Sequence, residues 1–245
     1  MVAYAAQSLT QSQIGQHSVH AHVGSKPKIK TYNDDNLDIY FNFFSLNDNP
    51  PGTIKIKNHF VDKTEIQNIA WLEYIYHKGK EMDSVELQKL LPDSLNFWYS
   101  IPDNRYKPIV LITYEQALDY CVWRSKVVSE RIGKKVTYRL PRTTEWKDIA
   151  EKIIRTDIKQ IDKELEETRK IIKKDSTQYT LVAREKPKSR IYNLFDNVTE
   201  MTFEKGIAMG SNNYDLTDPK TNLTRLIKYN SPNTYLGFRC VAEME

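Results

Sequence analysis

The chain has 245 residues, of which 40% are hydrophobic and 11% aromatic, enough apolar material for one sizeable core. Its 36 basic and 32 acidic residues leave a formal net charge of only +4, so the composition argues against nucleic-acid binding and favours a solvated surface of mixed charge. No apolar run approaches the roughly 20 residues of a membrane-spanning helix, so we expect no transmembrane segment.

Residues 1–36 are predicted to form a flexible N-terminal arm. Val2–Ser8 looks like the small-residue end of a secretory signal peptide but lacks the basic and apolar regions that should precede it, so a trimmed signal and a coincidence both stay open. The arm is rich in Gln, Ser, His and Lys, which is typical of a poorly packed segment. Without Cys or carboxylate neighbours, its three histidines are interpreted as surface residues and not as metal ligands: His17, His20 and His22.

The folded domain is predicted to cover residues 37–245. Leu37–Phe43 alternates apolar and polar residues, as a half-buried strand does, and Thr53–Lys57 alternates again after a Pro-Gly break. The chain then leads into an apolar helix that contains Trp71 and Tyr76.

The next segment has clear start and stop signals. Lys107–Ile112 is a short apolar run that predicts a buried strand. Thr113–Gln116 has the spacing of a helix capping box, and apolar residues then repeat on one helical face through Cys121 and Val128 until Gly133.

A third helix follows a short strand at Val136–Pro141 and is predicted to be long. From Glu145 to Asp175 the chain has no Gly or Pro, and we expect a helical insert at about residues 147–175. Apolar positions recur there at heptad spacing. The helix therefore lies across its own domain or forms an arm whose seam binds another chain. The seam consists of Ile154, Ile158, Ile161, Leu165, Thr168 and Ile172.

No catalytic motif is evident. The sequence has no P-loop, dinucleotide glycine motif, Cys and His cluster or nucleophile elbow. Five acids stand at uninformative spacing and are interpreted as surface residues or caps: Asp62, Glu65, Asp93, Asp103 and Glu145. We therefore predict no catalytic residue.

Three separated segments resemble the signature of the formylglycine-generating enzyme, or sulfatase-modifying factor, family: Arg139–Trp146, Asp196–Met201 and Leu236–Cys240. Tyr120–Trp123 matches the end of the family's second-helix pattern. The resemblance implies an α+β domain, a C-type-lectin-like variant of the formylglycine-generating-enzyme fold, here with a long inserted helix. Arg142 stands where the family normally has Thr, which puts the start of the third helix in doubt.

The resemblance does not extend to the family's copper chemistry. Family oxidases carry two cysteines five residues apart, whose soft thiolates hold copper, after a strand that Gly210–Asp215 resembles. From Ser211 to Arg239 this chain has no Cys. Its only cysteines, Cys121 and Cys240, stand at positions that form a disulfide in secreted family members, which would imply an oxidising compartment. The alternative is two buried free thiols in a cytosolic protein.

Asn197 and Glu200 correspond to residues near which family members hold a structural calcium. Two oxygen ligands fall short of the six to eight that calcium takes, so a hydrogen-bonded turn is the preferred interpretation, and we expect no cofactor.

Leu90–Tyr99 resembles a stretch of the gliding-motility and type IX secretion lipoproteins of Bacteroidota, which are non-oxidase family members. The resemblance implies a non-catalytic binding or scaffold protein in the periplasm or cell envelope of a Gram-negative bacterium. Its partners would be other envelope proteins, and any membrane association would run through a partner or a lost lipid anchor. One alternative is a divergent oxidoreductase, such as an iron-dependent oxygenase that needs a His and carboxylate triad, although only His59 and His77 lie outside the arm. The other is a lectin-like ligand-binding module.

Overall fold

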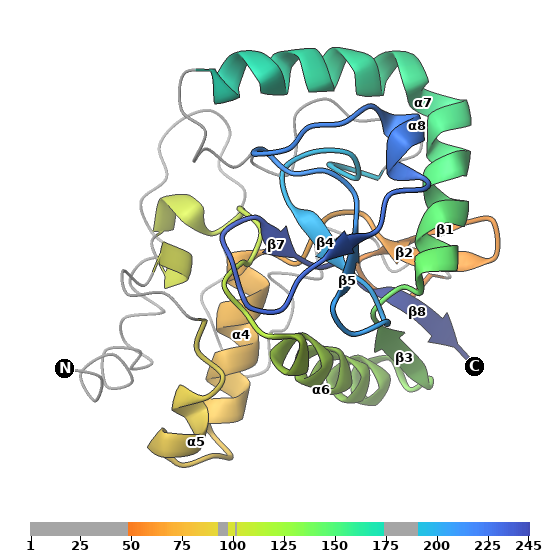
Figure 1. Ribbon diagram of the computed structural model, residues 1–245. Helices are drawn as coiled ribbons and strands as arrows, with labels where there is room; N and C mark the ends of the chain where they lie inside the picture. Colours follow the sequence, from red (N-terminus) through yellow and green to blue (C-terminus); the bar gives the residue numbers. More distant parts are fainter. Residues whose placement is uncertain (1–48, 93–97, 101, 174–190) are drawn as a thin grey trace, which may run out of the picture.

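The computed structural model describes residues 49–92, 98–100, 102–173 and 191–245 (Figure 1). The predicted arm at 1–36 and the predicted strand at Leu37–Phe43 lie outside these residues, as does Asp93. Among the helices that the structure describes, none is both long and apolar enough to span a bilayer.

A four-stranded antiparallel sheet forms one part of the fold, in the order β1-β2-β8-β3. The last strand of the chain lies between two early ones, so the sheet joins distant parts of the sequence. The predicted strand at 53–57 is confirmed as the first of them. The strands are β1 Thr53–Ile56, β2 His59–Asp62, β3 Val136–Arg139 and β8 Val241–Met244.

A second sheet of short strands has the order β6-β5-β4-β7. The pair β4 and β7 is parallel and the other pairs are antiparallel. Together with the helices, these mixed strands confirm the predicted α+β class. The strands are β4 Thr199–Met201, β5 Ile207–Met209, β6 Ile227–Lys228 and β7 Leu236–Gly237.

Two helices, α4 (Asn68–Gly79) and α6 (Tyr114–Ile132), pack through an aromatic cluster. Trp71 of α4 stacks on Tyr120 of α6 with ring centroids 5.6 Å apart. The predicted capping box of α6 is confirmed by reciprocal hydrogen bonds at its first turn, and Gly133 ends the helix at φ 66. Shorter elements complete this side of the molecule: α5 Ser84–Gln88, η1 Trp98–Ser100 and η2 Pro102–Asn104.

The prediction of a buried strand at residues 107–112 is wrong. Ile109 and Ile112 are buried, but the segment is irregular and makes only one isolated bridge, from Pro108 to Gln67. Pro108 has no N–H to donate to a ladder, and Leu111 has a positive φ of 60. An apolar run alone therefore predicted burial correctly and backbone conformation incorrectly.

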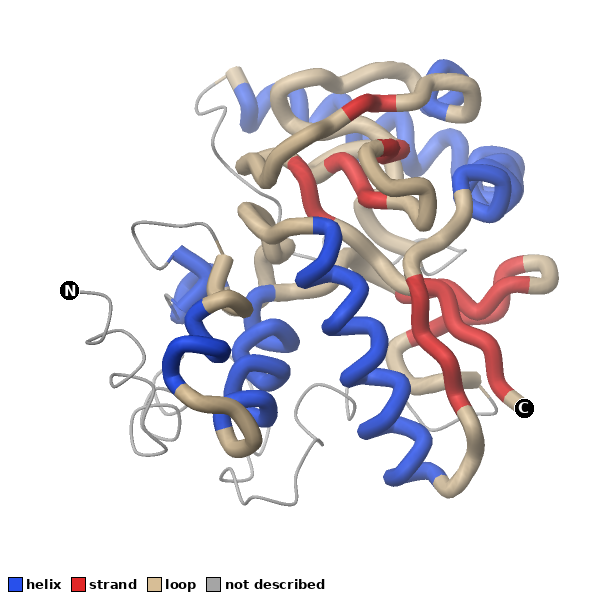
Figure 2. Tube along the Cα trace, turned by 60° about the horizontal axis from the view of Figure 1, so that its bottom comes forward, coloured by secondary structure: helices blue, strands red, loops and turns tan. Residues whose placement is uncertain are grey.

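The long helix α7 spans Thr143–Ile172, and a short helix α8 (Pro219–Asn222) packs near it. The first turn of α7 is stabilised by a residue distant in sequence: the Glu204 carboxylate accepts a hydrogen bond from the Thr143 amide at 3.0 Å. The helix runs along one side of the molecule and bends across the top of the second sheet, a path that the rotated view also shows (Figures 1 and 2).

The buried face of α7 is used within the chain. Ile161 and Leu165 are only 6% and 3% exposed, and both belong to a core cluster with Ile191 and Phe195. These two seam residues therefore pack in cis in this structure and are not open to another chain. The three other isoleucines proposed for partner binding are half-buried: Ile154, Ile158 and Ile172.

Candidate functional site

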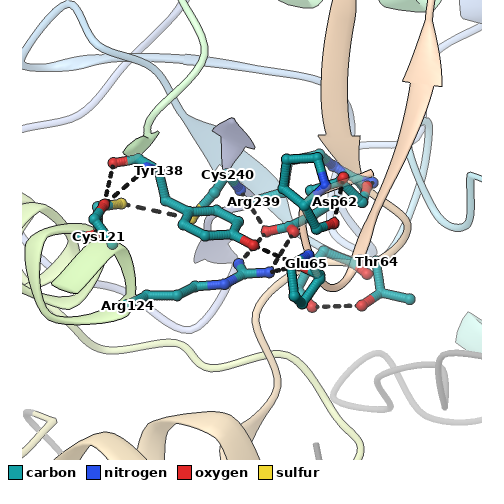
Figure 3. Close-up of polar contacts among 12 residues, drawn as sticks. Asp62, Thr64, Glu65, Cys121, Arg124, Tyr138, Arg239 and Cys240 are labelled. Carbon is teal, nitrogen blue, oxygen red and sulfur yellow. Dashed lines mark hydrogen bonds and ion pairs between the residues drawn. The ribbon is translucent and has the colours of Figure 1, made fainter. Parts of the chain in front are cut away.

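A buried ion pair joins α6 to the first sheet (Figure 3). Arg124 donates to both carboxylate oxygens of Asp62 at 2.8 Å, and the two side chains are 0% and 3% exposed. The guanidinium also donates to the Pro51 carbonyl and lies 3.9 Å from the Tyr138 ring centroid. A Cβ at Gly52 would lie 2.5 Å from Arg124 Nη2, so the close approach requires glycine there.

The two cysteines meet beside this ion pair. Their Sγ atoms are 3.5 Å apart, both residues are buried, and both are free thiols in this structure. Burial raises the pKa of the Cys240 thiol well above its usual value, so this thiol is a poor nucleophile when reduced. The Cys240 amide donates a hydrogen bond to the Asp62 carboxylate at 2.9 Å. This bond holds Cys240 next to the ion pair.

A second buried ion pair lies where the two sheets meet. Arg239 donates from Nε to Glu200 at 2.7 Å, and its other nitrogens donate to the Asp62 and Tyr192 carbonyls. The second oxygen of Glu200 accepts the indole N–H of Trp146 at 2.9 Å. This pair therefore connects the first turn of α7, strand β4 and the segment before β8.

Glu65 lies next to that pair and is fully buried. It accepts a hydrogen bond from Asn197 Nδ2 at 2.8 Å and a long contact from Asn193 Nδ2 at 3.5 Å. Burial, with a smaller contribution from Glu200, raises the pKa of this carboxyl to about 8, although Arg239 and Asn197 oppose the shift. The protonated form of Glu65 is consequently favoured at neutral pH.

Two loops of the second sheet carry exposed aromatic side chains, Tyr214 after β5 and Tyr235 before β7. Tyr214 and Tyr235 are 51% and 39% exposed, and their rings meet edge to face with centroids 5.6 Å apart. An ion pair between Arg225 and Asp215 ties the segment that contains Leu226, itself 51% exposed, to the loop that carries Tyr214.

Buried amides and hydroxyls hold that loop from beneath. Asn212 donates to the Thr199 hydroxyl at 2.7 Å and accepts the Tyr214 amide at 2.9 Å. Ser211 donates to Asn222 at 3.1 Å. These bonds fix the backbone of Tyr214, and the Tyr235 carbonyl accepts the Thr199 amide at 2.8 Å. A fixed backbone lowers the entropy lost on binding.

A shallow cleft of about 210 Å³ lies between the start of α6 and the turn before β5. Tyr114 and Tyr229 contribute to its walls, and an ion pair joins Glu115 to Lys205 there. Pockets for small molecules usually have volumes of about 300–1,000 Å³, so this cleft is small for a drug-sized ligand or cofactor.

The candidate acids named from the sequence do not converge on one site. Asp62 and Glu65 are buried in the two networks above, and Asp103 is exposed. Glu145 accepts two hydrogen bonds from Arg139 at 2.7 Å and one from the Arg142 amide at 2.8 Å, so it stabilises the start of α7.

The metal-ligand candidates are also separated. His59 lies 3.8 Å from Glu145 and from Asp148, whereas His77 contacts the Trp123 ring. No group of three or more His, Cys, Asp or Glu residues in the described ranges is arranged to hold a metal. Asn197 and Glu200, the residues considered for calcium, already bond to Glu65 and to Arg239 and Trp146. The histidines of the arm lie outside the described part of the chain.

Sequence reasoning missed Arg124, Arg239 and the Tyr214–Tyr235 pair. An Arg on the apolar face of a predicted helix, with Ala117 and Cys121, was a usable signal, because a charge at such a position needs a buried partner. The pairing of Tyr214 with Tyr235 joins two loop residues 21 apart in sequence (235 − 214), and no periodicity predicts it.

The fold and these networks define an α+β protein with two small sheets and buried ion pairs near the junction between them. The chain belongs to the sulfatase-modifying factor enzyme 1-like domain family, whose model matches residues 20–244.

Two solved structures resemble it. CarF has 15% sequence identity and a TM-score of 0.50, covering 76% of this chain and 87% of that one. PvdO from Pseudomonas aeruginosa has 12% identity and a TM-score of 0.46, covering 76% and 80%. At these identities the likeness to CarF supports the fold alone. A comparison with curated proteins gave no significant match.

Proposed function

We propose that this protein is a non-catalytic member of the family and that it binds other proteins in a bacterial cell-envelope complex. The observation that carries the proposal is the exposed Tyr214–Tyr235 ring pair, whose Tyr214 lies on a loop fixed by buried hydrogen bonds. Tyrosine is enriched at protein interfaces, where a rigid ring supplies contact area and a hydroxyl at low entropic cost.

The alternative of oxidation by the family's copper chemistry has little support in the sequence. The chain has no Cys between Ser211 and Arg239, where the oxidases carry their pair. Cys121 and Cys240 are buried against each other beneath the ion pair of Arg124. The cleft at the start of α6 is small for a cofactor or a large substrate, which also weighs against the lectin-like ligand-binding alternative.

The proposed location is the periplasm or envelope of a Gram-negative bacterium of the Bacteroidota, in a complex of the gliding-motility or type IX secretion kind. The likeness of Leu90–Tyr99 to those lipoproteins supports it. So does the adjacency of the two thiols, because a disulfide there would persist in the periplasm and would be reduced in the cytosol.

A pull-down from envelope extract of the source bacterium tests the proposal. We expect the wild-type protein to retain an envelope protein that the double variant Tyr214→Ser, Tyr235→Ser loses. The matched control is Tyr106→Ser, which removes a tyrosine of similar exposure, 40%, elsewhere on the surface. Equal capture by the double variant and the control contradicts the assigned surface.

Metal analysis of the same purified protein tests the enzymatic alternative. We expect no stoichiometric metal. One equivalent of copper or iron, together with no captured envelope protein, would instead favour the divergent oxidoreductase.

A further inference from the structure

Glu65 has no cation of its own. The charged groups that act on it are Glu200 of β4 and Arg239 in the segment before β8, and they are already paired with each other. Arg239 also donates to the carbonyl of Asp62, whose carboxylate is paired with Arg124. Across the described residues no ion pair joins Glu65 to a Lys or Arg. Three buried acids thus share two buried bases, and ionisation of Glu65 would leave an uncompensated negative charge away from water. The charge count and the burial agree that Glu65 holds a proton near neutral pH.

The two side chains that donate to Glu65 belong to one unusual loop. Asn193 and Asn197 have positive φ values of 54 and 70. Asn adopts this left-handed conformation more readily than most residues other than glycine, so both positions suit a tight loop. Both Asn side chains reach Glu65, so they link this loop to the segment after β2.

The loop 193–197 is linked to two other parts of the molecule. Asp196 accepts a hydrogen bond from Thr168 of α7 at 2.7 Å. The Asn197 amide donates to Asn213 Oδ1 at 3.2 Å, and Asn213 directly precedes Tyr214. Hydrogen bonds through the loop 193–197 therefore connect Glu65 to the C-terminal half of α7 and to the loop that carries Tyr214.

We propose that protonated Glu65 acts as a pH-sensitive latch, which keeps the loop 193–197 closed in acid and releases it as the pH rises. When the loop opens, Glu65 reaches water and regains its ordinary pKa of 4.5, whereas in the closed form its pKa is about 8. The closed form thus binds the proton more tightly. The open-to-closed ratio rises about tenfold per pH unit between these two values and levels off above the higher one.

The latch is tested by hydrogen exchange measured by mass spectrometry between pH 5 and pH 9, corrected for the intrinsic exchange rate. We expect protection of peptides from residues 191–217 to fall about tenfold per pH unit up to about pH 8, while peptides from α6 fall less. In Glu65→Gln, which keeps an acceptor for Asn197, this extra pH dependence should disappear.

Glu73→Gln is the matched control. Glu73 is also buried, and burial raises the pKa of its carboxyl to about 8, but it lies on α4, where the charges that act on it are those of Arg131 and Arg124. It should leave the pH dependence of residues 191–217 in place. Equal pH dependence in all peptides, or none in wild type, overturns the latch. Should Glu65→Gln fail to fold, the comparison of wild-type peptides still decides.

The influence of the latch on Tyr214 rests on the proposed function, because only a binding surface gives it a use. Hydrogen exchange needs no partner, so a failed pull-down leaves the latch standing, and unchanged exchange leaves the binding surface standing.

Discussion

The Arg124–Asp62 pair allows a quantitative test of what joins α6 to the first sheet. Replacing Arg124 with Met removes two bonds of 2.8 Å to Asp62 and one of 2.9 Å to the Pro51 carbonyl. Asp62 would keep the Cys240 amide as a donor but would be left as a buried charge without a cation. Removing one partner of a buried pair typically costs about 3–5 kcal/mol.

The assay is reversible denaturation in urea, followed by fluorescence or circular dichroism. Lys135→Met is the control, because Lys135 pairs with Glu245 at a similar distance, 2.8 Å, but the two are 67% and 73% exposed. Such exposed pairs contribute less than about 1 kcal/mol.

Coupling between the two partners is measured with the double variant Arg124→Met, Asp62→Asn. We expect it to be more stable than Arg124→Met alone, because the second change removes the unpaired charge. The reasoning is refuted if Arg124→Met costs no more than Lys135→Met, or if the double variant loses the sum of its single losses.

Three further predictions concern the cysteines, the long helix and calcium. Oxidation should join Cys121 to Cys240 across 119 residues of sequence and stabilise the fold by roughly 4–5 kcal/mol in the chain-entropy model. Intact-mass measurement with and without reductant, followed by alkylation, detects the bond. Two alkylated thiols in protein taken from the envelope would contradict the prediction. Leu165→Ala should lower the free energy of unfolding by about 2–5 kcal/mol, whereas Glu167→Ala on the exposed face should change it by about 0.5 kcal/mol or less. A Leu165→Asp variant that folds normally but loses self-association would instead place Leu165 in an interface. Excess calcium and excess chelator should give the same melting temperature, because both oxygens of Glu200 are occupied; a clear rise with calcium would establish a site.

Local signals in the sequence predicted local structure well. Thr113 and Gln116 satisfy each other's backbone amides within one turn, and Gly133 takes the left-handed conformation that ends α6. Each outcome depends on residues a few positions apart, so the sequence contains all the necessary information. At the start of α7 the local acceptor is Glu145, three residues from Arg142, but a second acceptor, Glu204, is 61 residues from Thr143 and could not be predicted locally.

The candidate site was much less predictable. The heptad pattern of α7 predicted an apolar face, but a pattern cannot say whether that face packs in cis, as Ile161 and Leu165 do. The partner of Arg239 is Glu200, 39 residues away, and nothing local relates them. Glu65 looked like an isolated surface acid because its hydrogen-bond donors, Asn193 and Asn197, are 128 and 132 residues away in sequence.

The position of β8 has a consequence for how the protein is made. Val241–Met244 supplies the strand that lies between β2 and β3, so the first sheet cannot assemble on the ribosome until the chain up to Met244 has been synthesised. Until then β2 and β3 have open edges, which are prone to aggregation. Nascent chains should therefore depend on chaperones until β8 is available to pair with both strands.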